Sequence, residues 1–164
     1  MGKGTTALPP GSRRGLCWIT FLMDTPTMVL LRHDLPDGSH HFDFMVQLNG
    51  PRRKSGGLHT WRVTDLIHQL QINDGGVSFW AEPIGEHREA YLTFEGDIGG
   101  GRGTVSRVAE GLVHVPMPDM IVASDQVLFE ASWWTKPHRN RRLRFSGARD
   151  DAGGSRWRFS VLPV

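Results

Sequence analysis

Turn-forming residues interrupt this chain at short intervals, and this feature limits the folds open to it more than any other. The clusters are Pro36-Asp37-Gly38, Asn49-Gly50-Pro51, Ser55-Gly56-Gly57, Asn73-Asp74-Gly75-Gly76 and Gly99-Gly100-Gly101-Arg102-Gly103. Such clusters mark turns, and the segments between them have the length of β-strands. The chain is therefore expected to fold mainly from short strands.

Apolar and polar residues alternate in several of these segments, as they do in half-buried antiparallel strands. Trp157, Phe159 and Val161, for example, alternate with Arg158 and Ser160. The predicted strands are residues 27–32, 41–48, 59–63, 90–94, 103–108, 111–115, 126–132, 141–146 and 156–162. One helix is predicted at residues 64–71, with Thr64 as its N-cap. Together these elements predict an all-β, mostly antiparallel fold: a compact β-barrel with short helical segments.

Length and cysteine content predict one domain in a reducing compartment. The 164 residues suit a single domain, which we place at 23–164, after a disordered or misassigned tail at 1–22. The single cysteine, Cys17, excludes an internal disulfide. No apolar run is long enough to span a bilayer, and no small-residue cleavage site follows the apolar segment 15–22. We therefore expect a cytoplasmic protein without a membrane partner.

The charge of the chain is nearly balanced, but its basic residues are clustered. A net charge of +2 does not by itself indicate a nucleic-acid partner. Basic residues gather at Arg52-Arg53-Lys54 and at 136–144, close behind Trp133-Trp134. Arginines with aromatic neighbours suit phosphates and stacked bases. A solvated loop and an alternating strand edge explain these clusters equally well.

Two histidines and an aspartate have a spacing suited to one divalent metal. His41 and Asp43 are two residues apart, so in a strand their side chains emerge on the same face. His33 precedes them across the turn-forming segment 35–39, which can fold the chain back and bring the three side chains together. Two imidazole nitrogens and one carboxylate oxygen would leave open positions on the ion for water and substrate. A His-x-Asp pair is more often a surface pair than a ligand set, and the remaining histidines are expected to be surface or structural residues. Those histidines, His87 apart, are His40, His59, His68, His114 and His138.

A series of short motifs follows in a fixed order along the chain. They are Arg32-His33-Asp34, His41-Phe42-Asp43-Phe44, Thr60-Trp61-Arg62-Val63, the segment 86–96 with His87, Tyr91 and Glu95, Gly103-Thr104-Val105, Leu143-Arg144-Phe145-Ser146-Gly147 and Trp157-Arg158-Phe159. In this order, from about Met28 onwards, the chain resembles the 3′-phosphoesterase domain of bacterial DNA ligase D, which also occurs as small stand-alone proteins.

The resemblance implies a fold, an activity and a set of site residues. It implies a β-barrel that uses a divalent metal, typically Mn²⁺, to trim the 3′ end of a DNA primer, removing a terminal ribonucleotide and then the remaining 3′-phosphate. His33, His41 and Asp43 match the metal ligands of that family, and His87 and Tyr91 match the side chains that hold the scissile phosphate. The implied partners are DNA or RNA-tipped DNA 3′ ends, and a DNA ligase or polymerase that acts in the same pathway.

The chain departs from the family at a position that contacts the phosphate. Met45 stands where an arginine often follows the Asp-Phe pair. The change removes one bidentate phosphate contact, which Arg62, Arg88 or Arg102 could replace. The basic residue after the Trp strand and the charged residues before the first strand also lack counterparts.

Two other readings of the same residues remain open. A barrel with a degenerate metal site would bind DNA ends without turnover. An iron and 2-oxoglutarate oxygenase would use His41 and Asp43 with a later histidine, His87 or His114, and would leave His33 without a role. We rank the phosphoesterase first, the DNA-end-binding barrel, which Met45 and the missing basic residues would support, second, and the oxygenase a distant third.

Overall fold

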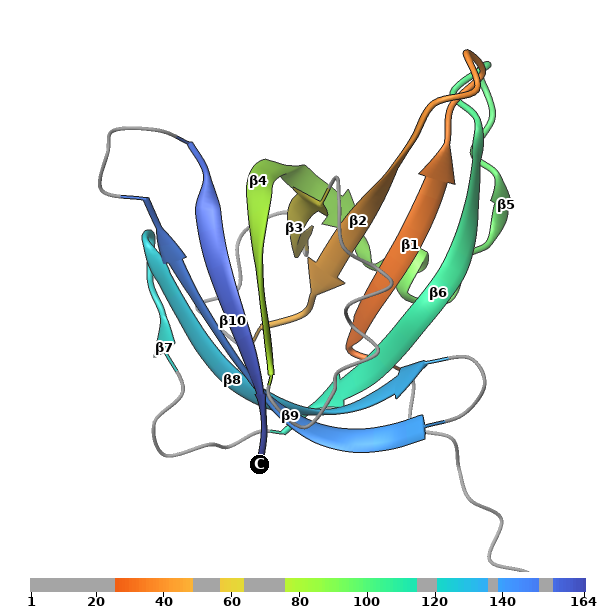
Figure 1. Ribbon diagram of the computed structural model, residues 1–164. Coiled ribbons are helices and arrows are strands. Elements are labelled where there is room, and N and C mark those ends of the chain that lie inside the picture. Colours follow the sequence, from red (N-terminus) through yellow and green to blue (C-terminus); the bar gives the residue numbers. More distant parts are fainter. Residues whose placement is uncertain (1–25, 49–56, 64–75, 115–120, 136–138, 151–154) are drawn as a thin grey trace, which may run out of the picture.

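Antiparallel strands make up most of the regular structure in the computed structural model (Figure 1). The strands are β1 (Met28–Asp34), β2 (His40–Val46), β3 (Gly57–Val63), β4 (Val77–Arg88), β5 (Gly96–Asp97), β6 (Thr104–Val113), β7 (Ile121–Val122), β8 (Gln126–Thr135), β9 (Arg139–Arg149) and β10 (Trp157–Pro163), and a short 3₁₀ helix, η2 (Glu89–Leu92), follows β4. The structure describes residues 26–48, 57–63, 76–114, 121–135, 139–150 and 155–164. The predicted tail at 1–22, the predicted helix at 64–71, the cluster Arg52-Arg53-Lys54, His68 and His138 lie outside the described residues.

The strands close into a ring. Their order is β6-β1-β2-β3-β4-β10-β9-β8, and β8 pairs back onto β6, while β5 and β7 add to β6 and β8. Every pairing is antiparallel. Figure 1 shows β1, β2 and β6 side by side on one wall, with β8, β9 and β10 forming the other. The predicted all-β, antiparallel barrel is confirmed.

The ring encloses an aromatic core. Its buried side chains include Phe44, Phe79, Trp133, Phe145 and Phe159. Phe44 on β2 lies at the centre, with ring centroids of the other four between 5.7 and 6.3 Å away. These side chains come from β2, β4, β8, β9 and β10, so the core ties both walls of the barrel together.

A second, smaller cluster lies on the opposite face of β1, β2, β3 and β6. We call it the outer cluster, and its buried members are Val29, Leu31, Met45, Leu58, Leu92 and Val105. Leu92 comes from η2, so this helix covers the outer face of the sheet. Because both faces of β1 are covered, its first four residues are all apolar and buried instead of alternating. The metal-site candidates lie on this outer face.

Two predictions are wrong, and three strands, β4 and the two-residue strands β5 and β7, were not predicted. The strand predicted at 90–94 is instead η2 and a turn, in which the Thr93 and Phe94 amides both donate to the Ala90 carbonyl. The separate strands predicted at 103–108 and 111–115 form one strand, β6, because Gly111 continues it in contact with β8. Strand β4 was missed because Pro83 and Gly85 interrupt an otherwise alternating segment.

Within the described ranges, no helical segment has the length and apolar character that a bilayer crossing requires.

Candidate metal centre

The hairpin between β1 and β2 places three side chains that could hold a metal on one face of the sheet. His33 is directly opposite His41, and Asp43 follows His41 by two residues on the same face. The turn is closed by hydrogen bonds from the Leu35 amide to the Ser39 carbonyl, 2.8 Å, and from the Gly38 amide to the Leu35 carbonyl, 3.0 Å. Gly38 has a φ of 84°, a conformation that glycine adopts without strain. The predicted convergence of the three residues is therefore present in the structure.

The side chain of Asp37 stabilises this turn. Its Oδ1 accepts hydrogen bonds from the Ser39 amide, 2.9 Å, and from the Ser39 hydroxyl, 2.6 Å. The hydroxyl bond is the main reason that the pKa of Asp37 lies below its ordinary value. The ionised aspartate thus supports the chain reversal that sets His33 opposite His41.

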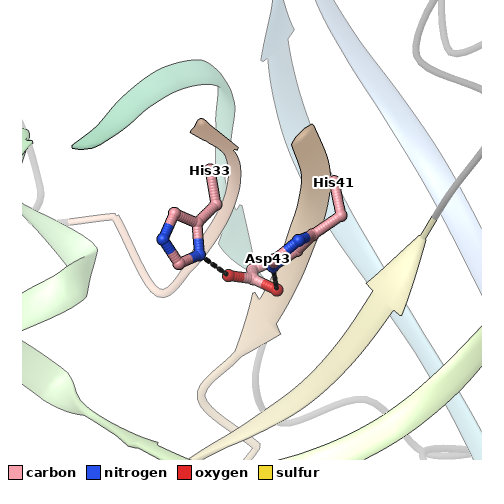
Figure 2. A group of neighbouring side chains, drawn as sticks. All are labelled: His33, His41 and Asp43. Atoms are coloured by element: carbon pink, nitrogen blue, oxygen red, sulfur yellow. Dashed lines mark ion pairs between the residues drawn. The ribbon is translucent and has the colours of Figure 1, made fainter. Parts of the chain in front are cut away.

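The donor atoms of the three residues surround a common point. Figure 2 shows the Asp43 carboxylate between the two imidazoles. His33 Nδ1 lies 3.8 Å from Asp43 Oδ2, and His41 Nε2 lies 3.4 Å from Asp43 Oδ1. Donors bound to one ion at about 2.1–2.2 Å are at most about 4.4 Å apart. The donor atoms here are all within 4.8 Å of one another, so small side-chain rotations suffice to bring them onto one ion.

A backbone carbonyl orients the His33 ring. His33 Nε2 lies 2.8 Å from the carbonyl oxygen of Arg102, which can only accept a hydrogen bond. Nε2 therefore carries the proton, and the lone pair of Nδ1 points toward Asp43. A metal-binding histidine is commonly held in this way by a carbonyl on its other nitrogen.

Asp43 is buried without the hydrogen bonds that a carboxylate normally needs. The residue is 2% exposed, and its Oδ1 has no hydrogen-bond partner among the described residues. An imidazole nitrogen lies near each of its oxygens, His41 Nε2 at 3.4 Å and His33 Nδ1 at 3.8 Å, and the one on His33 presents a lone pair. A buried carboxylate facing a lone pair is costly unless a cation sits between them. The donor set thus fits a bound metal ion.

The surroundings of His41 favour its neutral form, which is the form that binds metal. Burial lowers the pKa of His41, the Asp43 carboxylate raises it, and the positive charge of Arg62 lowers it again. The net direction is downward, so the ring keeps a free lone pair at neutral pH.

Arg62 is the predicted phosphate-binding arginine that lies at this centre. It is directly opposite Asp43 on β3, and its charge is close enough to act on His41. Its Nε is buried without a hydrogen-bond partner among the described residues. A phosphate at the centre would supply an acceptor for this guanidinium.

Arg102 contributes its carbonyl to the centre, while its guanidinium is engaged elsewhere. The side chain donates to the carbonyls of Gly99, 3.0 Å, and Ile98, 2.6 Å, in its own glycine-rich loop. The loop is in turn tied to Asp97, whose Oδ1 accepts the Gly99 amide. The structure therefore places Arg102 as a support for His33. The sequence could not reveal this role of Arg102, because any residue supplies a backbone carbonyl.

His87 and Tyr91 lie together at the junction of β4 and η2. Their ring centroids are 5.4 Å apart with the rings edge to face. His87 Nδ1 lies 2.9 Å from the Gly85 carbonyl, which leaves Nε2 as the nitrogen available for other contacts. Tyr91 packs against the outer cluster. Neither residue belongs to the group of three described above, which is the one such group among the described residues.

A pocket of about 330 Å³ opens beside Tyr91. Its lining includes Arg88, the third predicted phosphate-binding arginine, and Phe94, Ile98 and Gly99. The Arg102 side chain binds the carbonyls of Ile98 and Gly99, while its backbone carbonyl binds His33. One residue therefore touches both the pocket loop and His33, one of the three candidate ligands.

Other predicted residues have structural partners away from this group. His114 Nε2 lies 3.0 Å from the Ser132 hydroxyl, and His40 is exposed on the face opposite His41. In the basic segment behind Trp134, Arg142 and Arg144 both bind the buried carboxylate of Glu130, at 2.8 and 2.6 Å. These two arginines serve as counter-ions within the barrel wall.

Comparison of the chain with models of known protein families and with curated proteins finds no match.

Proposed function

We propose that this protein is a metal-dependent phosphoesterase that processes the 3′ ends of DNA, removing a terminal ribonucleotide or phosphate. The observation that carries the proposal is the convergence of His33, His41 and Asp43 on one face of the β1–β2 hairpin, with a buried carboxylate oxygen that lacks a partner among the described residues. The resemblance to the 3′-phosphoesterase domain of DNA ligase D supplies the reaction and the substrate.

The metal would be held by His33 Nδ1, by His41 and by the Asp43 carboxylate. Mixed nitrogen and oxygen donors suit a first-row transition ion, and the resemblance favours Mn²⁺. When bound, such an ion supplies Lewis-acid stabilisation of phosphate oxygens. The backbone carbonyl of Arg102 would keep Nδ1 of His33 aimed at the ion by holding the proton on Nε2.

The side chains around the group would bind and orient the phosphate. Arg62 has a buried Nε without a partner among the described residues, and its charge would balance a phosphate held opposite Asp43. Tyr91 could donate its hydroxyl proton to a phosphate oxygen. His87, with Nδ1 engaged by Gly85, would act through Nε2, by donating to a phosphate oxygen or protonating the departing oxygen.

The substitution at Met45 does not disturb this arrangement. Met45 is 1% exposed and belongs to the outer cluster, so its side chain fills an apolar space next to the site. Arg62 lies on the neighbouring strand β3, directly opposite Asp43. It takes the place of the missing arginine as the positive charge at the phosphate.

A protein with this function acts in the cytoplasm, before a DNA strand is extended by repair synthesis or sealed by ligation. Removal of a 3′ block leaves a 3′-hydroxyl, which a DNA polymerase or ligase then uses. A barrel that only bound DNA ends would make the same phosphate contacts, so turnover separates the two functions.

The test is an end-processing assay with purified full-length protein. Labelled primer-templates ending in a ribonucleotide, a 3′-phosphate or a 3′-hydroxyl are incubated with Mn²⁺, Co²⁺, Zn²⁺ or Mg²⁺. We expect conversion of the first two ends to a 3′-hydroxyl, loss of this activity in His41→Ala, and normal activity in His40→Ala. His40 is the matched control because it is adjacent in sequence, exposed and on the other face.

Two results would contradict the proposal. Equal activity in His41→Ala and wild type would remove the metal centre from the reaction. Iron-dependent formation of succinate from 2-oxoglutarate, without release of phosphate or nucleotide, would assign the same two-histidine, one-carboxylate donors to an oxygenase.

A further inference from the structure

Trp80 is an exposed aromatic ring in contact with two arginines. Its side chain on β4 is 41% exposed. The guanidinium carbon of Arg156 lies 4.9 Å from the centroid of the ring, and that of Arg158 lies 5.9 Å from it. Neither arginine takes part in the ion pairs found among the described residues. The result is a flat apolar surface with two positive charges that lack carboxylate partners in the described ranges.

This surface lies on the same face of the sheet as the metal-binding group. Phe79 and Ala81, on either side of Trp80 in sequence, point into the aromatic core, so Trp80 points outward. On the same outward face, Glu82 is directly opposite Arg62, and Arg62 is directly opposite Asp43. A continuous row of side chains therefore leads from the metal ligands across β3 to β4.

Strand geometry gives the separation between the two sites. Two strand spacings of about 4.8 Å separate Asp43 from Glu82, and Trp80 lies about 7 Å from Glu82 at right angles to that direction, along β4, so the straight-line path from Asp43 to Trp80 is about 12 Å. A stacked nucleic-acid strand advances about 3.4 Å per nucleotide. The path thus matches three or four nucleotides counted from a phosphate at the metal centre.

We propose that Trp80, Arg156 and Arg158 form a stacking platform for a base of the nucleic-acid strand whose 3′ end lies at the metal centre. This inference rests on the proposed function and adds a binding site to it. An aromatic face binds any base by stacking, and guanidinium groups bind the phosphates on either side. The platform holds the strand, and the metal centre acts on its end.

The surroundings of Trp80 fit a nucleic acid better than a protein partner. Ser78 and Ser160 lie on the same face beside it, joined by a hydrogen bond of 3.1 Å between their hydroxyls. Leu162, an exposed apolar residue on the same face of the neighbouring strand β10, is separated from Arg158 by Ser160. Protein interfaces bury a contiguous apolar centre, and the side chains around Trp80 are polar or charged.

Substitution of Glu82 is a second test of the path, and its expected effect on affinity is opposite to that of Trp80→Ala. It is exposed and lies between Arg62 and Trp80, so a strand that follows the row passes its carboxylate. The negative charge repels phosphates. Replacing it with glutamine is therefore expected to strengthen binding, whereas most surface substitutions leave binding unchanged or weaken it.

The experiment measures binding without hydrolysis. A fluorescein-labelled twelve-nucleotide single strand with a 3′-hydroxyl is titrated with full-length protein in the absence of added metal, and its anisotropy gives Kd. Trp80→Ala should weaken binding about 5- to 100-fold, the usual range for loss of one stacked base, while Trp80→Phe keeps most of the affinity. Glu82→Gln should tighten binding about two- to fivefold. Arg158→Gln should reduce the slope of log K against log salt by about 0.7.

The matched control is Ile121→Ala. Ile121 is also 41% exposed, but it lies on β7, which pairs only with β8 among the described strands. We expect its Kd to equal that of the wild type. Thermal melts show whether each variant is folded, and Arg158→Gln and Glu82→Gln carry the test if Trp80→Ala is not.

Three outcomes would overturn the platform: no binding of the strand by the wild type, equal Kd values for Trp80→Ala and Ile121→Ala, or equally effective displacement of the strand by a glutamate-rich peptide of the same charge. Because the strand carries no 3′-terminal ribonucleotide or phosphate to remove and no metal is added, this readout is independent of the end-processing assay. If the wild type hydrolyses 3′ ends but Trp80→Ala binds the strand as well as the wild type, only the platform is refuted. If Trp80→Ala weakens binding but the wild type hydrolyses no 3′ end, only the proposed function is refuted.

Discussion

Replacing Asp43 with asparagine should stabilise the metal-free protein and abolish its response to metal. Asp43 is buried, and its Oδ1 lacks a hydrogen-bond partner among the described residues. His33 presents a lone pair to the other oxygen, 3.8 Å away. Asparagine has nearly the same shape, carries no charge, and its amide N–H can donate to that lone pair. The substitution thus removes a cost that only a cation offsets.

The size of the effect follows from the burial of this group. A buried polar group without a partner costs about 1–3 kcal/mol, and more if it is charged. For a domain of about 150–250 residues, 1 kcal/mol corresponds to about 2–4 °C in Tm, so metal-free Asp43→Asn should melt about 2–12 °C above the wild type. Mn²⁺ at 100 times its Kd should stabilise the wild type by about 2.7 kcal/mol and leave the variant unchanged.

The assay is thermal unfolding at pH 8, above the usual pKa of a free imidazole. Both proteins are melted with a chelator and with excess Mn²⁺. We expect the variant to be the more stable protein without metal, and Mn²⁺ to raise the Tm of the wild type alone. A metal-free variant that melts below the wild type, or a variant with the full Mn²⁺ shift, would refute the assignment of Asp43 as a metal ligand.

Three further substitutions test the frame around the site. Phe44→Ala empties the centre of the aromatic core and should lower the free energy of unfolding by about 3–5 kcal/mol in urea titrations. Gly103→Ala places a Cβ against the Asp34 carbonyl at a φ of +97°, which should displace the neighbouring Arg102 carbonyl and weaken Mn²⁺ binding about 10- to 100-fold by calorimetry. Glu130→Gln should make the free energy of unfolding less dependent on pH between pH 7 and pH 3. The hydrogen bond from Arg144 holds the pKa of Glu130 below its ordinary value of 4.5, so the ionised carboxylate stabilises the fold at neutral pH and this contribution disappears as the pH falls through the folded pKa. Urea titrations at pH 7 and pH 3 measure the difference, and a wild-type acid response in Glu130→Gln contradicts it.

Local patterns in the sequence were sufficient for the barrel and for the β1–β2 hairpin. Alternation identified β10 within one residue of its observed bounds, and the turn at Pro36-Asp37-Gly38 correctly implied that His33 returns to His41. Both predictions rest on short-range signals, because a turn and an alternating strand are each encoded by residues that are close together in the sequence. The donor group therefore followed from the sequence alone.

Features that depend on contacts between distant segments could not be read in this way. Strand β4 contains Pro83 and Gly85, which argue against a strand, yet pairing with β3 and β10 holds it extended. Residues 89–92 have apolar residues suited to a strand, but Leu92 instead turns onto the outer cluster, and Arg107 of β6 binds its carbonyl at 2.8 Å. Trp80 and Arg158 are far apart in sequence and meet only through the register of β4 with β10.

Direct measurement of Mn²⁺ binding tests the metal centre, on which the proposed function depends. Titration followed by electron paramagnetic resonance counts the ions bound per chain in the wild type, in His33→Ala and in His40→Ala. We predict one ion bound by the wild type and by His40→Ala, and none at the same concentrations by His33→Ala. Equal binding by His33→Ala and the wild type, or no binding by the wild type, would contradict a centre built from His33, His41 and Asp43.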